Sequence, residues 1–171
     1  MIHCNIAVDF QKWKKIKNIE SLINSTTSLI INNLDLKKYQ SKKHDLEIFF
    51  NLVGKQKMKK INYQFLGKNY PTNVLSFANL DENLIRKIGL KKIIEQYQNL
   101  ILGDIVLDYQ TIEQEAIQQN KNFIDHLTHL IVHAILHLIG HDHQQEKMAK
   151  EMEQLEIKIL KKLLIKNPYD V

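Results

Sequence analysis

The sequence predicts a single domain that combines α-helices with a small β-sheet. Four short segments are rich in apolar, aromatic and β-branched residues, and the segments between them repeat their apolar residues at helical spacing. The chain has 171 residues, and a chain of this size buries about 70% of its unfolded surface, so that it needs no disulfide or metal to form a core. We therefore expect one domain over residues 1–171.

The expected strands are short, and the last of them is the most apolar. They are residues 3–8, 46–53, 73–77 and 101–107. The nearly continuous apolar run of the last segment is typical of a buried strand in the centre of a sheet. Tyr70-Pro71 indicates a turn before the third strand, because a proline disfavours helical backbone in the residue before it.

The expected helices follow from apolar residues spaced three and four positions apart. They are residues 10–33, with a weak point at 25–27, then 58–65 with a start a few residues earlier, 83–98 with an interruption at Gly89, 111–120, 123–139 and 144–165. The last helix has one apolar stripe that we interpret as core packing, formed by Met148, Met152, Leu155, Ile159 and Leu163. One interpretation of residues 83–98 is a mobile rim near a functional cleft.

Composition limits the location and partners of the protein. The net charge of +5 is compatible with a polyanionic partner but does not identify one. Cys4 is the only cysteine, so an intramolecular disulfide is excluded and a reducing cytosol is the expected compartment. The N-terminus lacks the pattern of a secretory signal, and no apolar run reaches the roughly 18 residues that span a membrane.

The histidines are concentrated near the C-terminus, where six of eight fall between positions 126 and 143. His133 and His137 are four residues apart, so on a helix they share one face. Gly140 can end that helix and reverse the chain, which allows His143 to approach the same point. Three imidazoles leave one tetrahedral position open, as in catalytic zinc sites. The sequence therefore predicts one Zn²⁺ ion bound by His133, His137 and His143.

Other polar residues of this region receive different interpretations. His126 and His129 lie on nearly the same stripe, and we expect them to pack against or support the ligands, because three ligands already complete an open site. His141 is expected to face solvent or to line the cleft. Asp142 either orients a ligand imidazole or caps the next helix, and we favour the cap.

Ala134 separates this pattern from one group of zinc proteases with the same histidine spacing. In those enzymes a glutamate follows the first histidine and acts as the general base. Alanine has no titratable group, so peptide hydrolysis by that route is not expected. A bound metal still lowers the pKa of water to about 7 and polarises a scissile group, which suits a phosphodiester.

The histidine segment resembles the signature of the bacterial YbeY family, the zinc-dependent endoribonucleases of rRNA maturation. That pattern, His-Gly-x-Leu-His-Leu-x-Gly-Tyr-Asp-His, is matched over residues 133–143 except at Ala134 and His141. Three further motifs agree with the family in order. They are Asn62-x-x-Phe65 with the Pro-Thr-Asn-Val-Leu-Ser-Phe run 71–77, the Leu-Gly-Asp-Ile-Val run 102–106, and Met152 with Glu156.

The resemblance implies an α+β fold with a mixed four-stranded sheet, and a metal site on a helix and its following turn. It also implies a single-strand-specific, zinc-dependent endoribonuclease that matures the 3′ end of small-subunit (16S) rRNA and serves ribosome quality control in the cytoplasm. The implied partners are rRNA, the small ribosomal subunit, ribosomal proteins and an assembly GTPase. Neither DNA nor a membrane is an expected partner.

The resemblance also nominates residues for the substrate. Thr72, Asn73 and Ser76 match a stretch beside the family's cleft, where Thr72 or Ser76 either contacts substrate or stabilises the strand. Lys59 and Lys60 belong to a basic group that leads into the Asn62 motif, and we expect them to contact RNA phosphates.

One departure from the family concerns a positive charge. The family usually has arginine after the aromatic residue matched by Phe65, whereas this chain has Leu66. Lys68, two residues later, is our hypothetical substitute, although lysine lacks the bidentate fork of arginine. The catalytic group is expected to be zinc-bound water, with assistance from Lys68 or Ser76, and attack by the 2′-hydroxyl of the RNA stays open.

Two alternative functions remain open on the sequence. The first is another zinc hydrolase that acts on a peptide or small ester, against which Ala134 argues. The second is a ribosome-assembly binding factor that keeps the metal but has little or no nuclease activity, which Leu66 favours.

Overall fold

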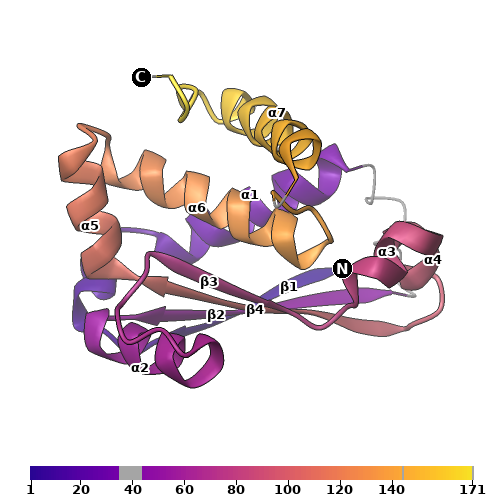
Figure 1. Ribbon diagram of the computed structural model, residues 1–171, viewed down its shortest axis with the longest axis horizontal. Helices are drawn as coiled ribbons and strands as arrows, with labels where there is room; N and C mark the ends of the chain where they lie inside the picture. Colours follow the sequence, from indigo (N-terminus) through magenta and orange to yellow (C-terminus); the bar gives the residue numbers. More distant parts are fainter. Residues whose placement is uncertain (35–43, 144, 171) are drawn as a thin grey trace.

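The sheet of this protein has four strands and is covered by helices on both faces, as the computed structural model shows for residues 1–34, 44–143 and 145–170 (Figure 1). The strands are β1 (Ile2–Val8), β2 (Asp45–Val53), β3 (Val74–Ala78) and β4 (Asn99–Asp108). Their order is β1-β2-β4-β3, in which β1, β2 and β4 run parallel and β3 is antiparallel to β4. The expected α+β fold with a mixed four-stranded sheet is confirmed, and the apolar strand β4 is central.

The helices form layers around this sheet. They are η1 (Gln11–Lys15, a 3₁₀ helix), α1 (Ile19–Asn33), α2 (Lys55–Leu66), α3 (Glu82–Ile88), α4 (Leu90–Ile94), α5 (Tyr109–Gln118), α6 (Phe123–Leu138) and α7 (Glu146–Lys162). In Figure 1, α1 and α6 lie on one face of the sheet, α7 lies outside α6, and α2 lies on the opposite face. Helix α6 is therefore the central helix of the molecule, and the site residues it carries are held by neighbours on several sides.

The main core lies between the sheet and helices α1 and α6. Alternate residues of β2 point into it, because successive side chains of a strand face opposite sides of the sheet. These are Leu46, Ile48, Phe50 and Leu52, all fully buried. A smaller core on the other face joins α2 to the sheet through Met58, Val53 and Val106, with Leu75 and Phe77 of β3 packed against it.

Side-chain caps fix the starts of α5 and α6, which removes unpaired backbone donors. The Asn122 side chain accepts hydrogen bonds from the backbone N–H groups of Ile124 and Asp125, at the start of α6. Asp108 accepts from those of Gln110 and Thr111 at the start of α5. The direction of α6, and hence of its histidines, is thus set at its first turn.

The expected single helix over residues 10–33 is wrong in its first part. The chain forms η1, then breaks at Asn18, which has a left-handed φ of 60° and precedes α1. The weak point expected at residues 25–27 is regular helix, where the Thr27 hydroxyl donates to the Ile23 carbonyl at 2.7 Å. Gln144, at which the last helix was expected to begin, lies outside the described residues; α7 ends at Lys162 rather than near Ile165.

The segment 83–98 forms α3 and α4, separated at Gly89 as expected. Helical structure ends at Ile94 rather than at Gln98, and the last residues lead into β4. Ile85 of α3 is buried and packs against Gly140, in the turn after α6. In the described part of the chain, no helix is long and apolar enough to cross a membrane.

Candidate metal centre

The histidines His133 and His137 lie one turn apart on α6, as their spacing predicts. The opposite side of this helix is core, formed by Leu127, Leu130, Ile131, Ala134 and Leu138, all buried. Because that side is packed, the helix cannot rotate without exposing apolar surface, and the two imidazoles keep a fixed direction.

The turn after α6 reverses the chain through Gly140. Its φ is 90°, its N–H donates to the His137 carbonyl at 3.1 Å, and the N–H of His141 donates to the Leu136 carbonyl at 3.0 Å. This pair of bonds is the Schellman arrangement, in which glycine supplies the left-handed residue at low cost. A Cβ atom on Gly140 would lie 3.0 Å from Cγ2 of Ile85. Backbone conformation and packing therefore both favour glycine here, and the turn delivers His143 to the site.

The three predicted ligands come together. One ligand nitrogen from each of His133, His137 and His143 lies within 4.8 Å of the others. The Nε2 atoms of His133 and His137 are 3.2 Å apart, close to the roughly 3.3 Å expected between two nitrogens bound tetrahedrally to one zinc ion. The His137 and His143 rings have centroids 4.9 Å apart. The donor set and its spacing fit a single divalent ion.

A buried carboxylate from α7 holds the first ligand in place. Glu156 is fully buried, and its Oε1 lies 2.7 Å from Nδ1 of His133. Its Oε2 lies 3.2 Å from Nε2 of His129 and also accepts from the Tyr169 hydroxyl. Burial opposes the charge of Glu156, but the hydrogen bonds from His129, His133 and Tyr169 outweigh it and lower its pKa to about 2.

The charge of Glu156 determines which nitrogen of His133 is free. An ionised carboxylate only accepts hydrogen bonds, so Nδ1 of His133 must carry the proton. Its Nε2 then has a free lone pair, directed toward His137. This carboxylate–histidine pair is the usual support of a metal-binding imidazole.

His137 is neutral at neutral pH for a different reason. Burial, followed by the neighbouring charges of His133 and His143, lowers its pKa to about 4. A neutral imidazole is the form that binds a metal. Metal binding by His137 therefore does not require the loss of a proton from an imidazolium at neutral pH.

The neighbouring histidines lie outside the trio. His129 bonds Glu156, and His126 donates from Nε2 to Oε2 of Glu115 at 2.9 Å. His141 is half-buried, and burial lowers its pKa. The supporting role expected for His129 agrees with its bond to Glu156, the carboxylate that bonds His133, whereas the roles of His126 and His141 stay predictions.

The expectation for Asp142 is wrong. Helix α7 begins after Gln145 and has no side-chain cap. Oδ1 of Asp142 instead accepts from the backbone N–H of His143 at 2.7 Å. The carboxylate thus contacts the backbone of the third ligand within the turn.

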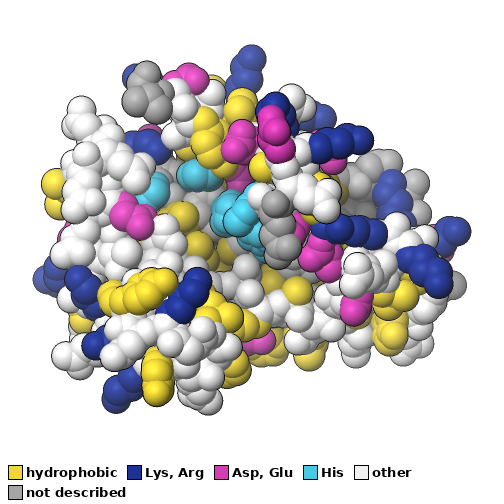
Figure 2. Space-filling model, in the orientation of Figure 1, with side chains coloured by type: hydrophobic (Ala, Val, Ile, Leu, Met, Phe, Trp, Pro, Cys, Tyr) yellow, Lys and Arg dark blue, Asp and Glu magenta, His cyan; other side chains and the backbone are white. Residues whose placement is uncertain are grey.

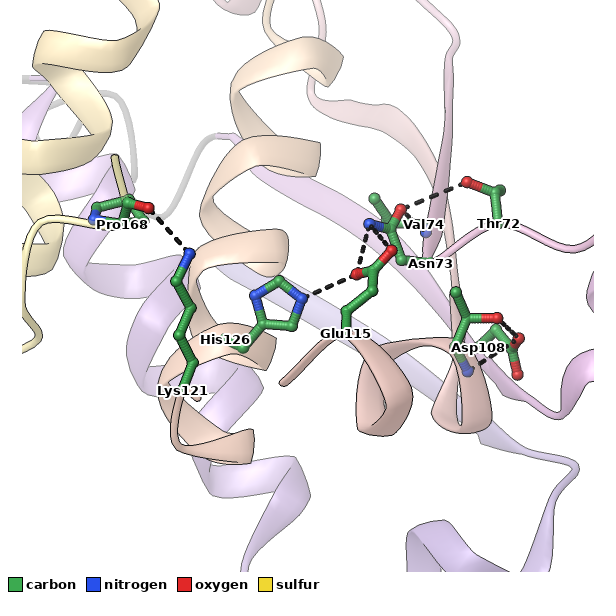
Figure 3. Close-up of polar contacts among 9 residues, drawn as sticks. Thr72, Asn73, Val74, Asp108, Glu115, Lys121, His126 and Pro168 are labelled. Carbon is green, nitrogen blue, oxygen red and sulfur yellow. Dashed lines mark hydrogen bonds and ion pairs between the residues drawn. The ribbon is translucent and has the colours of Figure 1, made fainter. Parts of the chain in front are cut away.

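The predicted substrate residue Asn73 takes part in a second, partly buried network (Figure 3). Its Nδ2 donates to both carboxylate oxygens of Glu115, at 3.1 and 2.9 Å, and Glu115 in turn bonds His126. Burial opposes ionisation of Glu115, but the bonds from His126 and Asn73 leave its pKa below its usual value. Asn73 therefore ties the start of β3 to α5 and α6.

The other predicted substrate residues surround this network. The Thr72 hydroxyl donates to Oδ1 of Asn73 at 3.4 Å (Figure 3). Ser76 is half-buried, and by strand alternation it faces α6, since its neighbours Leu75 and Phe77 face α2. Lys59, Lys60 and Lys68 are exposed on α2 and the residues after it. Their roles toward RNA remain predictions.

The roles of two carboxylates of the site were not predicted from the sequence, where Glu156 was noted only as part of a family motif. Glu156 lies between Met152 and Ile159 on the buried side of α7, and an acidic residue on an apolar stripe was the available signal. Glu115 lacks such a signal, because its partners come from β3 and α6.

The histidines lie in a hollow of the surface. Figure 2 shows them on the floor of a groove between the side chains of the upper and lower parts of the molecule. A cavity of about 630 Å³ is lined by His126 and His129 and by residues near the C-terminus, which are 164–168 and 170. Within it, Nζ of Lys121 donates to the Pro168 carbonyl at 2.9 Å (Figure 3).

Comparison with known proteins points to one family. A family model described as "Endoribonuclease YbeY" matches residues 7–164. A protein of Bartonella bacilliformis named Endoribonuclease YbeY is 40% identical over 169 residues, 99% of this chain and 98% of the relative. A protein of the same name from Bartonella henselae is 38% identical over 169 residues, which are 99% of this chain and 98% of that protein.

A solved structure supports the fold. The solution structure of TM1509 from Thermotoga maritima matches with a TM-score of 0.55 and 20% sequence identity. The match covers 99% of this chain and 100% of the TM1509 chain. At this identity the likeness concerns the fold alone.

Proposed function

Since the chain belongs to the YbeY family, we propose that it is a zinc-dependent endoribonuclease that cleaves single-stranded RNA. The observation that carries this proposal is the convergence of His133, His137 and His143 within 4.8 Å. Among the described residues, no further histidine, cysteine or acidic ligand joins this group. Three protein ligands and an open position suit a catalytic rather than a structural metal.

The residues of the chain have separable tasks in this proposal. His133, His137 and His143 hold the ion, and Glu156 fixes the proton on Nδ1 of His133. A divalent cation in such a site supplies a Lewis acid for the scissile phosphodiester. Imidazole ligands and the small nitrogen–nitrogen spacing favour zinc among the common divalent ions.

The proposed substrate is the 3′ region of precursor small-subunit rRNA, and the proposed setting is ribosome assembly and quality control in the cytoplasm. Small ribosomal subunits, ribosomal proteins and an assembly GTPase are the proposed partners. Ser76 faces α6 and Lys68 is exposed, so both remain candidates to contact the RNA. Thr72 bonds Asn73, and Asn73 bonds Glu115, which favours positioning of the strand over direct contact with the RNA.

The decisive experiment is cleavage of precursor small-subunit rRNA by zinc-loaded protein, with and without a chelator, followed by mapping of the product ends. We expect cleavage that is lost with chelator and in His137→Ala. A 5′-phosphate would identify water as the nucleophile, and a 2′,3′-cyclic phosphate would identify the 2′-hydroxyl. Intact RNA in the presence of zinc-loaded protein would contradict the proposal, and a casein assay in parallel tests peptide hydrolysis.

Leu66 supports one second candidate, an assembly factor that binds RNA without cutting it. Its apolar side chain is exposed where the family usually has arginine, so that charge is missing from the surface. Tight binding of precursor rRNA together with no chelator-sensitive cleavage would favour this candidate.

A further inference from the structure

Exposed aromatic side chains are concentrated in one short part of the surface. Every residue from position 63 to position 70 is exposed, at the end of α2 and in the following loop. Tyr63, Phe65 and Tyr70 expose 61%, 60% and 56% of their surface. Large aromatic residues normally bury their rings, so three in eight positions mark a binding surface.

We propose that this surface binds the bases and phosphates of single-stranded RNA and leads the strand to the metal centre. It consists of Lys59, Lys60, Tyr63, Phe65, Lys68 and Tyr70, and we call it the aromatic–lysine surface. The inference rests on the proposed function, because it supplies the binding platform for the same RNA.

The fold holds one aromatic ring of this surface and the backbone of a second aromatic residue. The Phe65 ring lies against the Phe77 ring of β3, with centroids 5.0 Å apart. Asn62, which is buried, donates from Nδ2 to the Tyr70 carbonyl at 2.7 Å. Gly67 ends α2 with a left-handed φ of 70°, so the loop turns back toward this bond. Rings held in place lose little conformational entropy on binding, which favours stacking on a ligand.

The lysines identify the ligand as an anion. Lys59, Lys60 and Lys68 are exposed, and none has an acidic partner among the described residues. By contrast, Lys57 on the same helix pairs with Asp9. Lys59 and Tyr63 are four residues apart and share one exposed side of α2.

Unpaired cations beside exposed rings are the combination that binds single-stranded nucleic acid, where rings stack on bases and cations track phosphates. In Figure 2, dark blue and yellow side chains alternate over the lower lobe, in the region of α2, on the same side of the molecule as the histidines. An acidic protein would satisfy the lysines but leave the stacking faces of the rings unused.

The position of β3 connects this surface with the metal centre. Phe77, which supports Phe65, faces α2, whereas the adjacent residue Ser76 faces α6. Strand β3 is an edge strand with only β4 beside it, so no other strand separates the two sides. An RNA strand that stacks on the aromatic–lysine surface can therefore cross the edge of the sheet and enter the groove of the histidines.

A fluorescent reporter tests base stacking directly. The only tryptophan, Trp13, is fully buried and gives a constant background. In Phe65→Trp we expect a 2′-O-methyl oligouridine, which cannot be cleaved through its own 2′-hydroxyl, to quench the new emission. The matched control is Tyr97→Trp, because Tyr97 is 49% exposed but lies outside this surface. An abasic oligomer of equal length should bind through phosphates without quenching.

The affinity for the oligouridine and its dependence on salt distinguish the contribution of the aromatic rings from that of the lysines. Tyr63→Ala with Tyr70→Ala should weaken binding of the oligouridine by about 5- to 100-fold for each lost stacking contact, without changing the salt slope. Replacement of Lys59, Lys60 and Lys68 by alanine should lower that slope by about 0.7 for each lost phosphate contact.

Two results overturn the inference. The first is that the oligouridine leaves the emission of Phe65→Trp unquenched. The second is that the double tyrosine variant binds the oligouridine as tightly as the wild type. Either result would mark the surface as a docking site for protein. If the wild-type protein cuts rRNA and these variants bind and cut equally well, the inference fails and the proposed function stands. If the wild-type protein does not cut RNA but the reporter is quenched, the inference stands and the proposed function fails.

Discussion

The carboxylate of Glu156 lies 2.7 Å from Nδ1 of His133, across the interface of α7 and α6. The two residues are 23 positions apart, and the bond fixes both the ring orientation and the proton of a predicted ligand. The same carboxylate also bonds His129 and Tyr169. The metal centre thus depends on the packing of the last helix as well as on its three histidines.

Glu156→Gln should weaken zinc binding by about 10- to 100-fold, because a neutral amide is a poorer acceptor for the Nδ1–H of His133. Zinc affinity can be measured by competition with a chromogenic chelator. The control is Glu146→Gln, an exposed residue of the same helix that pairs with Lys150. Equal affinity in both variants would show that the carboxylate does not support the ligand.

His137→Ala should lose about one equivalent of zinc and melt at a lower temperature in the presence of zinc, because ligand binding stabilises the folded state. His141→Ala should retain its zinc, since His141 lies in the same turn but outside the trio. Atomic absorption and thermal unfolding measure both effects. Zinc loss in His141→Ala but not in His137→Ala would mean that the ligands are wrongly assigned.

Gly140→Ala should destabilise the protein by about 1–3 kcal/mol, because alanine strains the left-handed backbone. The new Cβ atom would also press on Ile85, 3.0 Å away. The melting temperature should fall by about 2–4 °C for each kcal/mol, and zinc affinity should fall as His143 shifts. Adding Ile85→Val removes Cδ1, 3.1 Å from the new Cβ atom, but keeps Cγ2 and Cβ, so it should recover only a small part of the loss; complete recovery would argue against backbone strain.

The contribution of Glu115 to the stability of the folded protein should decrease as the pH falls. Its folded-state pKa lies below the ordinary value of 4.5, so its contribution is present above that pH and is lost as the pH falls through the folded pKa. Glu115→Gln should therefore be destabilised at pH 7, and the difference from wild type should shrink near pH 3. Urea unfolding at the two pH values measures this difference.

The control for Glu115 is Glu113→Gln, since Glu113 forms an exposed pair with Lys12 and such pairs contribute little. A difference in unfolding free energy that stays constant from pH 7 to pH 3 would contradict the prediction. The bonds to Asn73 and His126 would then act only through geometry.

The ligands were predictable because their geometry is local. The spacing of His133 and His137 is set by the helix repeat, and Gly140 signals the reversal that brings in His143. The same locality explains the strands, whose bounds differ from the expected ones by a few residues at most.

The parts that sequence reasoning missed depend on tertiary contacts. Glu156 and Glu115 acquire their roles from partners on other elements. Asp142 was misread because both a helix cap and a turn contact begin with the same short acidic residue, and the position of the α7 start decides between them. The break at Asn18 has no glycine or proline to announce it.

The order of the chain has a consequence for biosynthesis. Strands β1, β2 and β4 are assembled from the first 108 residues, and the three histidines follow. Glu156 and Tyr169 come later still, so the support of His133 is completed only when the C-terminal residues have left the ribosome. A nascent polypeptide that ends before Glu156 carries all three imidazoles but not the anion that orients the first of them.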